Sequence, residues 1–345
     1  STQAKTLFPY TTLFRSPHQL IFGRRFTVTK TFLQAINEGL RQILETVPES
    51  YILGEDVGTY GGGFGATKGL VADFPDRVLD TPISEAAITG VATGSALLGK
   101  RPILEIQFSD FLTVAIDQLV NEAAKIHFLS NGEQSVPMVI RAASGSGTGA
   151  SSQHSQSFEN WFAHVPGLIV VMPSNAYDAK GILVAAVKNN NPVLIFEPKS
   201  LYKTAMPVPS ELYEVPIGQA KLVKEGTDLT IIALGRMVEV AKSVASQTSA
   251  SLEIVDPITI SPLDIKTLTA SAQKTGKVLI LTEAVTRSGI SGEILAQLVE
   301  AGFSGAIKRL GGQFMPISAA KSVELAQVPT VDAILATIDK MMKEV

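Results

Sequence analysis

Three stretches of the chain carry polar or aromatic side chains where an α/β sheet would hold a site. Glu85 opens a run of small and apolar residues predicted to be a helix. Gln107 and Phe111 follow an apolar strand, and His154 follows a loop of glycine and serine. Open parallel sheets bind ligands just beyond the carboxyl ends of their strands, and loops on a rigid scaffold often carry function. A carboxylate and an imidazole at such positions are suited to proton transfer.

Each of these groups also has an ordinary structural explanation, and the residues by themselves leave both open. An acid in the first turn of a helix, such as Glu85, is stabilised by the helix dipole. Ser109 or Asp110 would cap the helix that follows. His154 would then be a solvated loop residue.

Other chemistries have less support. The GSGTG loop at residues 145–149 suggests dinucleotide binding, but no apolar helix follows it directly and no acid lies about 20 residues on at a strand end. The histidines are scattered, which argues against a metal centre. Cysteine is absent, which excludes disulfides and thiol chemistry. No Gly-x-Ser-x-Gly elbow supports a serine hydrolase.

The elements that must position these residues alternate between strand and helix. Continuous apolar strands of this kind predict an α/β fold with a mainly parallel sheet flanked by helices. Apolar residues at helical spacing from 36 to 47 predict a helix that ends at Pro48. Ser84 and Ser174 are expected to cap later helices. The expected strands are residues 51–53, 77–80, 102–108, 136–140, 168–171 and 192–196, and the later helices are residues 85–98, 110–129 and 175–188.

The length of 345 residues suits two domains. We expect the first at residues 27–198, a proline-containing linker at 199–216, and a second, smaller α/β domain at 217–345. The second domain is expected to hold strands at 229–234, 252–255 and 278–281, and helices at 236–245, 264–272, 292–300 and 331–343.

Residues 1–26 differ from the rest because they contain four basic residues and no acid. A transit peptide has this composition. A translated adaptor or assembly scar explains residues 6–16 slightly better, and either interpretation leaves the segment outside the fold.

Composition limits the partners. The net charge is −3 with acids and bases mixed throughout, which argues against nucleic acid as the main partner. The sequence contains no run of about 18 apolar residues, so no membrane span is predicted.

Nine motifs are spread along residues 27–345: LGED (53–56), DTPISE (80–85), EIQFSDF (105–111), DQLVNEAAK (117–125), QHSQSFENWFAHVPGL (153–168), DAKG (178–181), GRMV (235–238), SPLD (261–264) and KTGKVLILTEA (274–284). Together they resemble the β subunits of the thiamine-diphosphate-dependent decarboxylating component of 2-oxo acid dehydrogenases. This family includes pyruvate, branched-chain 2-oxo acid and acetoin dehydrogenases. The resemblance implies a pyrimidine-binding domain followed by a transketolase C-terminal-like domain.

The resemblance implies a role for each candidate residue. Glu85 matches the glutamate that hydrogen-bonds a ring nitrogen of the cofactor's aminopyrimidine, and it should be buried to share a proton. Phe111 matches an aromatic residue packed on that ring, with Gln107 beside it and Ile83 lining the site. His154 matches a histidine that assists proton transfer or reductive acylation of a lipoyl group.

The resemblance also implies ions and partners. A structural potassium ion would be held by backbone carbonyls of Met138, Ala186, Val187, Asn189 and Asn191. The chain lacks the Gly-Asp-Gly motif that binds Mg²⁺ and diphosphate, so an α subunit is expected to supply those ligands in an α2β2 tetramer that serves a lipoyl-bearing acyltransferase core. The expected location is the bacterial cytoplasm, or alternatively the mitochondrial matrix or a plastid.

Three alternatives stay open. The chain is expected to act on pyruvate or a branched-chain 2-oxo acid, with an acetoin dehydrogenase β subunit as an alternative. A transketolase-type enzyme usually carries its diphosphate-binding domain in the same chain, for which 345 residues leave no room. A catalytically silent structural or interaction subunit would be expected to have lost Glu85 or His154.

Overall fold

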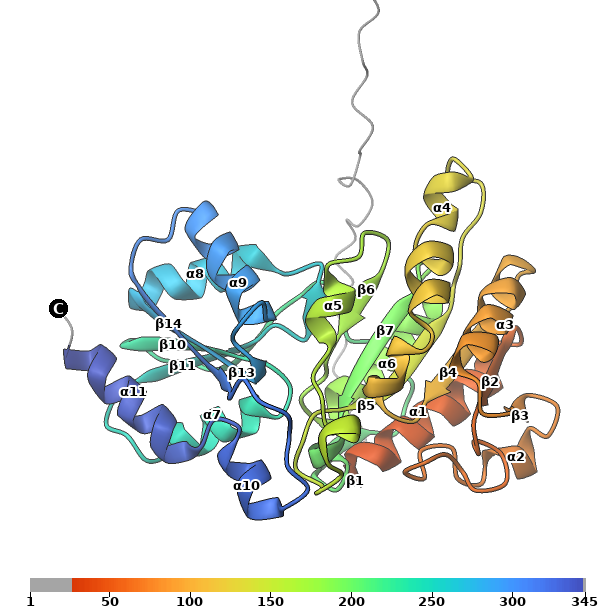
Figure 1. Ribbon diagram of the computed structural model, residues 1–345, viewed down its shortest axis with the longest axis horizontal. Coiled ribbons are helices and arrows are strands. Elements are labelled where there is room, and N and C mark those ends of the chain that lie inside the picture. Colours follow the sequence, from red (N-terminus) through yellow and green to blue (C-terminus); the bar gives the residue numbers. More distant parts are fainter. Residues whose placement is uncertain (1–26, 344–345) are drawn as a thin grey trace, which may run out of the picture.

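The computed structural model describes residues 27–343 and contains two α/β domains side by side (Figure 1). The first is built on a seven-stranded sheet in the order β12-β6-β7-β5-β4-β2-β3, in which only the β12–β6 pair is antiparallel. The predicted α/β fold with mainly parallel sheets is confirmed. The strands are β2 (Ser50–Gly54), β3 (Val78–Asp80), β4 (Arg101–Ile106), β5 (Val139–Ser144), β6 (Ile169–Val171), β7 (Val193–Pro198) and β12 (Thr259–Ser261).

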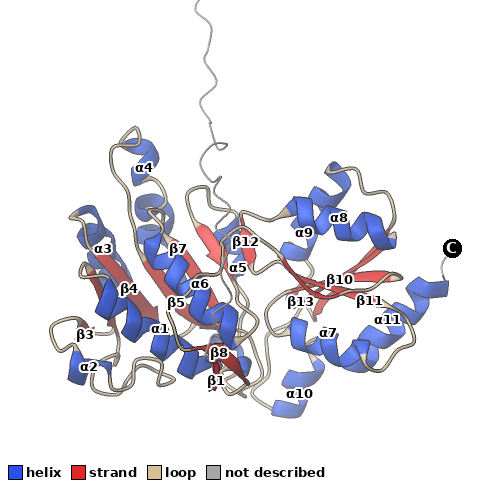
Figure 2. Cartoon of the chain, turned by 180° about the vertical axis from the view of Figure 1, so that it is seen from behind, coloured by secondary structure: helices blue, strands red, loops and turns tan. Residues whose placement is uncertain are grey.

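Helices cover both faces of this sheet (Figure 2). They are α1 (Phe32–Thr46), α2 (Leu70–Asp73), α3 (Glu85–Leu97), α4 (Ile126–Leu129), α5 (Glu159–Ala163) and α6 (Ala176–Lys188). Helix α1 begins with a capping box in which Thr31 and Gln34 satisfy each other's backbone N–H groups.

One of the two predicted caps is wrong. Ser84 occupies the N-cap position of α3 as predicted, although its side chain accepts no capping hydrogen bond. At α6 the cap is Asn175, whose side chain accepts from the Asp178 backbone, while Ser174 Oγ donates to Asp256 at 2.5 Å. Ser174 thus bonds to a carboxylate of the second domain instead of capping α6.

The long helix predicted at residues 110–129 is also wrong. The chain forms a 3-10 helix at Ser109–Thr113, a π-helix at Gln118–Ala123 and the short α4. The wide turn is visible in the backbone bond from Ala124 to the carbonyl of Leu119, five residues earlier. Leu112, Leu119 and Ala123 are buried in the first domain's core along this stretch, while Ile116, which a regular helix would place on the same face, is 38% exposed.

The second domain has a five-stranded sheet in the order β14-β13-β10-β11-β9, parallel except for β9. The predicted strands and helices are present, while β9, β14 and α10 were not predicted. Its strands are β9 (Lys221–Lys224), β10 (Leu229–Ala233), β11 (Leu252–Asp256), β13 (Lys277–Val285) and β14 (Ala306–Gly312), and its helices are α7 (Met237–Ala245), α8 (Ile265–Thr275), α9 (Ile290–Glu300), α10 (Lys321–Ala326) and α11 (Val331–Lys343).

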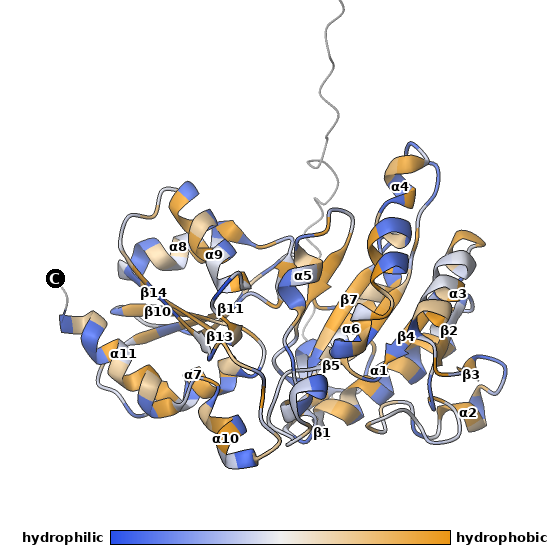
Figure 3. Cartoon of the chain, in the orientation of Figure 1, coloured by the Kyte–Doolittle hydropathy of each residue, from blue (hydrophilic) through white to orange (hydrophobic). Residues whose placement is uncertain are grey.

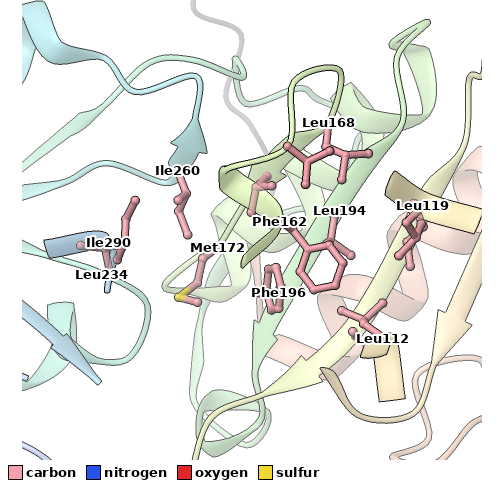
Figure 4. Packing of buried hydrophobic residues seen from close by; sticks show 14 of the residues in the cluster. Leu112, Leu119, Phe162, Leu168, Met172, Leu194, Phe196, Leu234, Ile260 and Ile290 are labelled. Carbon is pink, nitrogen blue, oxygen red and sulfur yellow. The ribbon is translucent and has the colours of Figure 1, made fainter. Parts of the chain in front are cut away.

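The two domains share one apolar core. A single buried cluster runs from Leu112 and Leu119 through Phe162 and Phe196 to Ile290 of the second domain (Figure 4). Strand β12, which follows β11 in the chain, returns to pair with β6 of the first sheet. This continuous core holds the domains in a defined relation, which matters for any site between them.

The segment predicted as a linker is partly ordered into the first domain. Strand β8 (Ala205–Pro209) pairs antiparallel with β1 (Thr27–Thr31). The fully buried Lys180 Nζ donates to the carbonyls of Pro209 and Glu211 and pairs with Glu38. The predicted boundaries at 198 and 216 stay predictions.

Apolar residues concentrate on the strands and inner helix faces (Figure 3). Between residues 27 and 343, no helix combines the length and apolar character needed to cross a membrane. The interpretations of residues 1–26 lie outside the described part of the chain.

Candidate active site

The candidate residues meet at the carboxyl edge of the first sheet because its central strands are parallel. Gly54 at the end of β2 pairs with Asp80 of β3 and with Glu105 of β4. The segments that leave β2, β3, β4 and β5 therefore emerge at one edge. They carry Glu55, Glu85, Gln107 and, farther along, His154.

Glu85 is the first residue of α3 and only 9% of it is exposed. Among residues 27–343, no side chain or backbone group is found donating a hydrogen bond to its carboxylate. Burying a carboxylate without a donor is costly, so such a group is normally completed by a ligand or another chain. Ile83, expected to line the site, is 83% exposed and does not shield Glu85 within this chain.

Glu55 lies beside Glu85 and was missed as a site residue. Burial raises the pKa of the Glu55 carboxyl, and the negative charges of Glu85 and Asp56 raise it further, while a hydrogen bond from the Ser84 backbone lowers it. Its Oε1 is buried without a partner in the described chain. Its place directly after β2, within LGED, was the signal that could have identified it.

The aromatic side chains form a second group at the same edge. The His154 ring stands edge-on to Phe108 and Phe111, with centroid distances of 4.6 and 5.3 Å. Phe64, from the glycine-rich loop after β2, packs on Phe108 at 5.3 Å. Gln107 lies against the backbone of that loop, where a Cβ on Gly63 would be 3.4 Å from its side chain.

The structure thus brings Phe111 and His154 into contact. Within the described chain, no hydrogen bond or ring contact joins either of them to Glu85. The site consists of the carboxylate pair Glu55 and Glu85 and, at the same sheet edge, an aromatic wall formed by Phe108, Phe111 and His154.

A buried ionic network lies just behind this edge and was not predicted. Arg141 on β5 donates to Glu197 at 2.7 and 3.0 Å and to Glu105 at 2.8 Å. Tyr202 Oη donates to Glu197 at 2.9 Å. Every member is nearly or fully buried, and the Glu105 carboxyl reaches the loop that carries Gly62 and Gly63. The network connects three central strands to the glycine-rich loop of the site.

Four of the five carbonyls expected to hold potassium, those of Met138, Ala186, Val187 and Asn189, already accept hydrogen bonds. Arg101 Nη1 donates to the carbonyl oxygens of Val187 and Asn189 at 2.7 and 3.0 Å, and the Met138 carbonyl accepts from Val193. A guanidinium keeps its positive charge and repels a second cation at the same oxygens. The residues present therefore do not fit a potassium ion held by all five carbonyls. Within residues 27–343, no group of three or more histidine or acidic side chains is placed to hold a metal.

Comparisons with known proteins identify the class. The transketolase pyrimidine-binding domain pattern matches residues 29–204, and the transketolase C-terminal domain pattern matches residues 218–334. The fold resembles that of a solved structure titled "Split gene transketolase, inactive beta4 tetramer", with a TM-score of 0.75 and 20% identity, over 90% of this chain and 98% of the other. The chain is thus a two-domain protein of the transketolase type.

Curated relatives define the family within that class. The 2-oxoisovalerate dehydrogenase subunit beta of Bacillus subtilis is 43% identical over 83% of this chain and 90% of the relative. The mitochondrial pyruvate dehydrogenase E1 component subunit beta-2 of Oryza sativa is 39% identical over 88% and 84%. An acetoin:2,6-dichlorophenolindophenol oxidoreductase subunit beta of B. subtilis is 38% identical over 90% and 96%. The chain belongs to the family of β subunits of 2-oxo acid dehydrogenase E1 components.

Proposed function

We propose that this chain holds and activates the aminopyrimidine ring of thiamine diphosphate during oxidative decarboxylation of a 2-oxo acid and reductive acylation of a lipoyl group. The observation that carries the proposal is Glu85, a largely buried glutamate with no hydrogen-bond donor among the described residues, at the same sheet edge as the aromatic side chains of Phe108, Phe111 and His154. A carboxylate and aromatic rings are the groups that a flat ring with protonatable nitrogens would require. Thiamine diphosphate, when bound, would supply an acidic C–H whose deprotonated carbon is a nucleophile toward an oxo group.

Each residue of the site has a separate role in this proposal. Glu85 would share a proton with a ring nitrogen, and Phe111 and Gln107 would orient the ring. The exposed Ile83 would contact the cofactor or the partner chain. His154, held edge-on between two phenyl rings, would move a proton at the reacting carbon or at the lipoyl sulfur. Glu55, whose carboxyl has a pKa raised by burial and by the charges of Glu85 and Asp56, would be a second acid beside the ring.

We infer that a separate α subunit completes the site. The Gly-Asp-Gly motif is missing from the chain. Apolar side chains lie exposed beside Glu85 and along the outer face of α3, including Ile83, Val91 and Leu98. Exposed apolar surface of this kind marks an interaction site. An α2β2 tetramer that serves a lipoyl-bearing acyltransferase core is the assembly we propose.

The substrate is pyruvate or a branched-chain 2-oxo acid in this proposal. Acetoin is the second candidate, because two acetoin oxidoreductase β subunits match about 90% of the chain. The bacterial cytoplasm is the proposed location. Since relatives from mitochondria also match, the mitochondrial matrix is the alternative, with a plastid as a further one.

The test compares the chain alone with the chain and its α partner. Calorimetry of the isolated chain with thiamine diphosphate and Mg²⁺ should show weak binding, because strong diphosphate contacts need charged partners. Light scattering should show an α2β2 tetramer only on co-expression, and decarboxylation should appear only there. Tight Mg²⁺-dependent binding and turnover by the isolated chain would overturn the half-site proposal.

A further inference from the structure

The glycine-rich loop after β5 is held by two carboxylates of the second domain. Glu324 on α10 accepts hydrogen bonds from the backbone N–H groups of Gly147 and Gly149, at 2.7 and 2.9 Å. Glu283 on β13 accepts from the backbone N–H of Ser146 and from its hydroxyl, the latter at 2.6 Å. The loop amides that suggested a dinucleotide site thus donate to acids more than 130 residues away in the sequence.

The loop backbone is shaped around these acids. Gly145 has a φ of 79°, and a Cβ there would lie 2.9 Å from Glu283 Oε2. Glycine is therefore required both by the left-handed conformation and by the close approach of the carboxylate. Glu324 is fully buried, so its two backbone donors are not replaceable by water at the surface.

Cations balance this arrangement. Arg236 Nε lies 2.8 Å from Glu283 Oε2. Lys199, buried at the end of β7, lies near Glu283 and Glu324. Burial lowers the pKa of Lys199 to about 8, and the negative charges of these acids and of Asp110 oppose that shift. Arg236 and Lys199 thus place positive charge beside the two glutamates.

The far end of the same loop is tied to the first domain. Asp110 Oδ1 accepts from the side-chain amide of Gln156 at 2.8 Å, and Gly145 N donates to the Gln156 carbonyl at 3.2 Å. His154 lies between the two tied ends. Its ring orientation therefore depends on anchors from both domains.

We propose that Glu324 and Glu283 are positioning residues that hold the 145–154 loop so that His154 faces the reacting group. The proposal rests on the role proposed above for His154. It makes the second domain part of the catalytic apparatus without any contact with substrate.

The variant that tests this is Glu324→Gln in the assembled α–β enzyme. A glutamine keeps the size but presents an NH₂ group to one of the two backbone donors, so one hydrogen bond is lost and a donor faces a donor. Amide hydrogen exchange of residues 145–150, followed by mass spectrometry, should accelerate about tenfold. The matched control is Glu300→Gln, at the exposed end of α9, which should leave exchange in the loop unchanged.

Kinetics then separate positioning from a general loss of structure. Glu324→Gln should lower kcat for lipoyl acylation about tenfold while KM for the 2-oxo acid changes little. In a His154→Ala background the same substitution should cause no further loss, because residues that act as one unit are not additive. Where Glu324→Gln fails to assemble, Ser146→Ala removes one donor to Glu283 and should give a smaller rise in exchange.

Three outcomes would overturn the proposal. Unchanged exchange in Glu324→Gln would mean that this acid does not hold the loop. Accelerated exchange with an equal kinetic loss in both backgrounds would mean that the effect bypasses His154. If His154→Ala alone leaves both rates unchanged, the role of His154 fails first, and the positioning role that depends on it falls with it.

Discussion

Glu105 and Glu197 at the centre of the first sheet and Glu55 and Glu85 at its edge are all nearly buried, but their surroundings differ. The central acids share Arg141, which makes three hydrogen bonds to them, and Tyr202 adds a fourth. Within the described chain, no cation forms an ion pair with the edge acids, and the negative charge of Glu85 raises the pKa of Glu55.

This difference separates structure from function. A buried acid with a full set of donors supports the fold, because removing one partner leaves the other charge buried without compensation. A buried acid left incomplete costs stability, so a fold retains it where an incoming ligand completes it. The comparison predicts that changes at the centre will lower stability and that changes at the edge will lower activity.

The largest effect is expected at the edge. Glu85→Gln should reduce decarboxylation by the α–β enzyme by about 10²–10⁴-fold, because the amide cannot share a proton with the ring. Melting temperature and assembly should stay as in the parent. The assay uses an artificial electron acceptor, with Glu45→Gln on the exposed side of α1 as the control. Near-normal turnover would break the distinction between edge and centre.

The centre should respond in the opposite way. Glu197→Gln should destabilise the protein by about 3–5 kcal/mol, because Arg141 loses most of its charge compensation while buried. Denaturant unfolding measures the change. The half-exposed pair Lys188–Glu214 offers a matched control, and Glu214→Gln should cost at most about 1 kcal/mol. Equal losses from the two variants would contradict the role of burial.

Substitution of His154 tests whether the aromatic wall acts with the edge acids in catalysis. His154→Ala should slow lipoyl acylation on the order of tenfold, and at least as much as decarboxylation, because a single proton-transfer group is removed. Separate assays of the artificial-acceptor reaction and the full complex reaction measure the two steps. Unchanged rates in both would make His154 an ordinary loop residue.

Glu159 on α5 extends the comparison to the pH dependence of stability. It is buried with Oε2 unpartnered in the described chain, and burial raises the pKa of its carboxyl to about 7. The folded state then holds the proton more tightly than the unfolded state, so this group's contribution to stability falls as pH rises from about 4.5 to 7. Glu159→Gln should gain stability over the parent between pH 5 and pH 8, by about 2–3 kcal/mol. Glu300→Gln, which retains Glu159, should show no such pH-dependent gain over the parent.

The smallest effect is expected outside both regions. A chain that starts at Thr27 should keep its activity, assembly and melting temperature, because residues 1–26 lie outside the matched domains and lack a packing period. A fall of several degrees in melting temperature, or failure to assemble with the α subunit, would show that the segment contributes to the fold.

The sequence by itself determined the alternation of most strands and helices in both domains and the residues that follow the central strands of the first sheet. Continuous apolar strands predicted parallel pairing, and parallel pairing places Glu85 and Gln107 at one edge. Such inferences succeed because they depend on local spacing. The predicted long helix at 110–129 failed because this stretch changes from 3-10 to π to α geometry, and the helical spacing of its apolar residues does not encode that change.

Only the tertiary structure decided what each polar group contacts. Arg141 finds Glu105 and Glu197 across strands, and Glu324 finds Gly147 across domains. These partners are far apart in the chain, and no local pattern encodes them. The exposure of Ile83 likewise depends on which elements pack beside it. Hydrogen bonds and burial of this kind follow from the three-dimensional path of the backbone, which brings together groups that the linear sequence keeps apart.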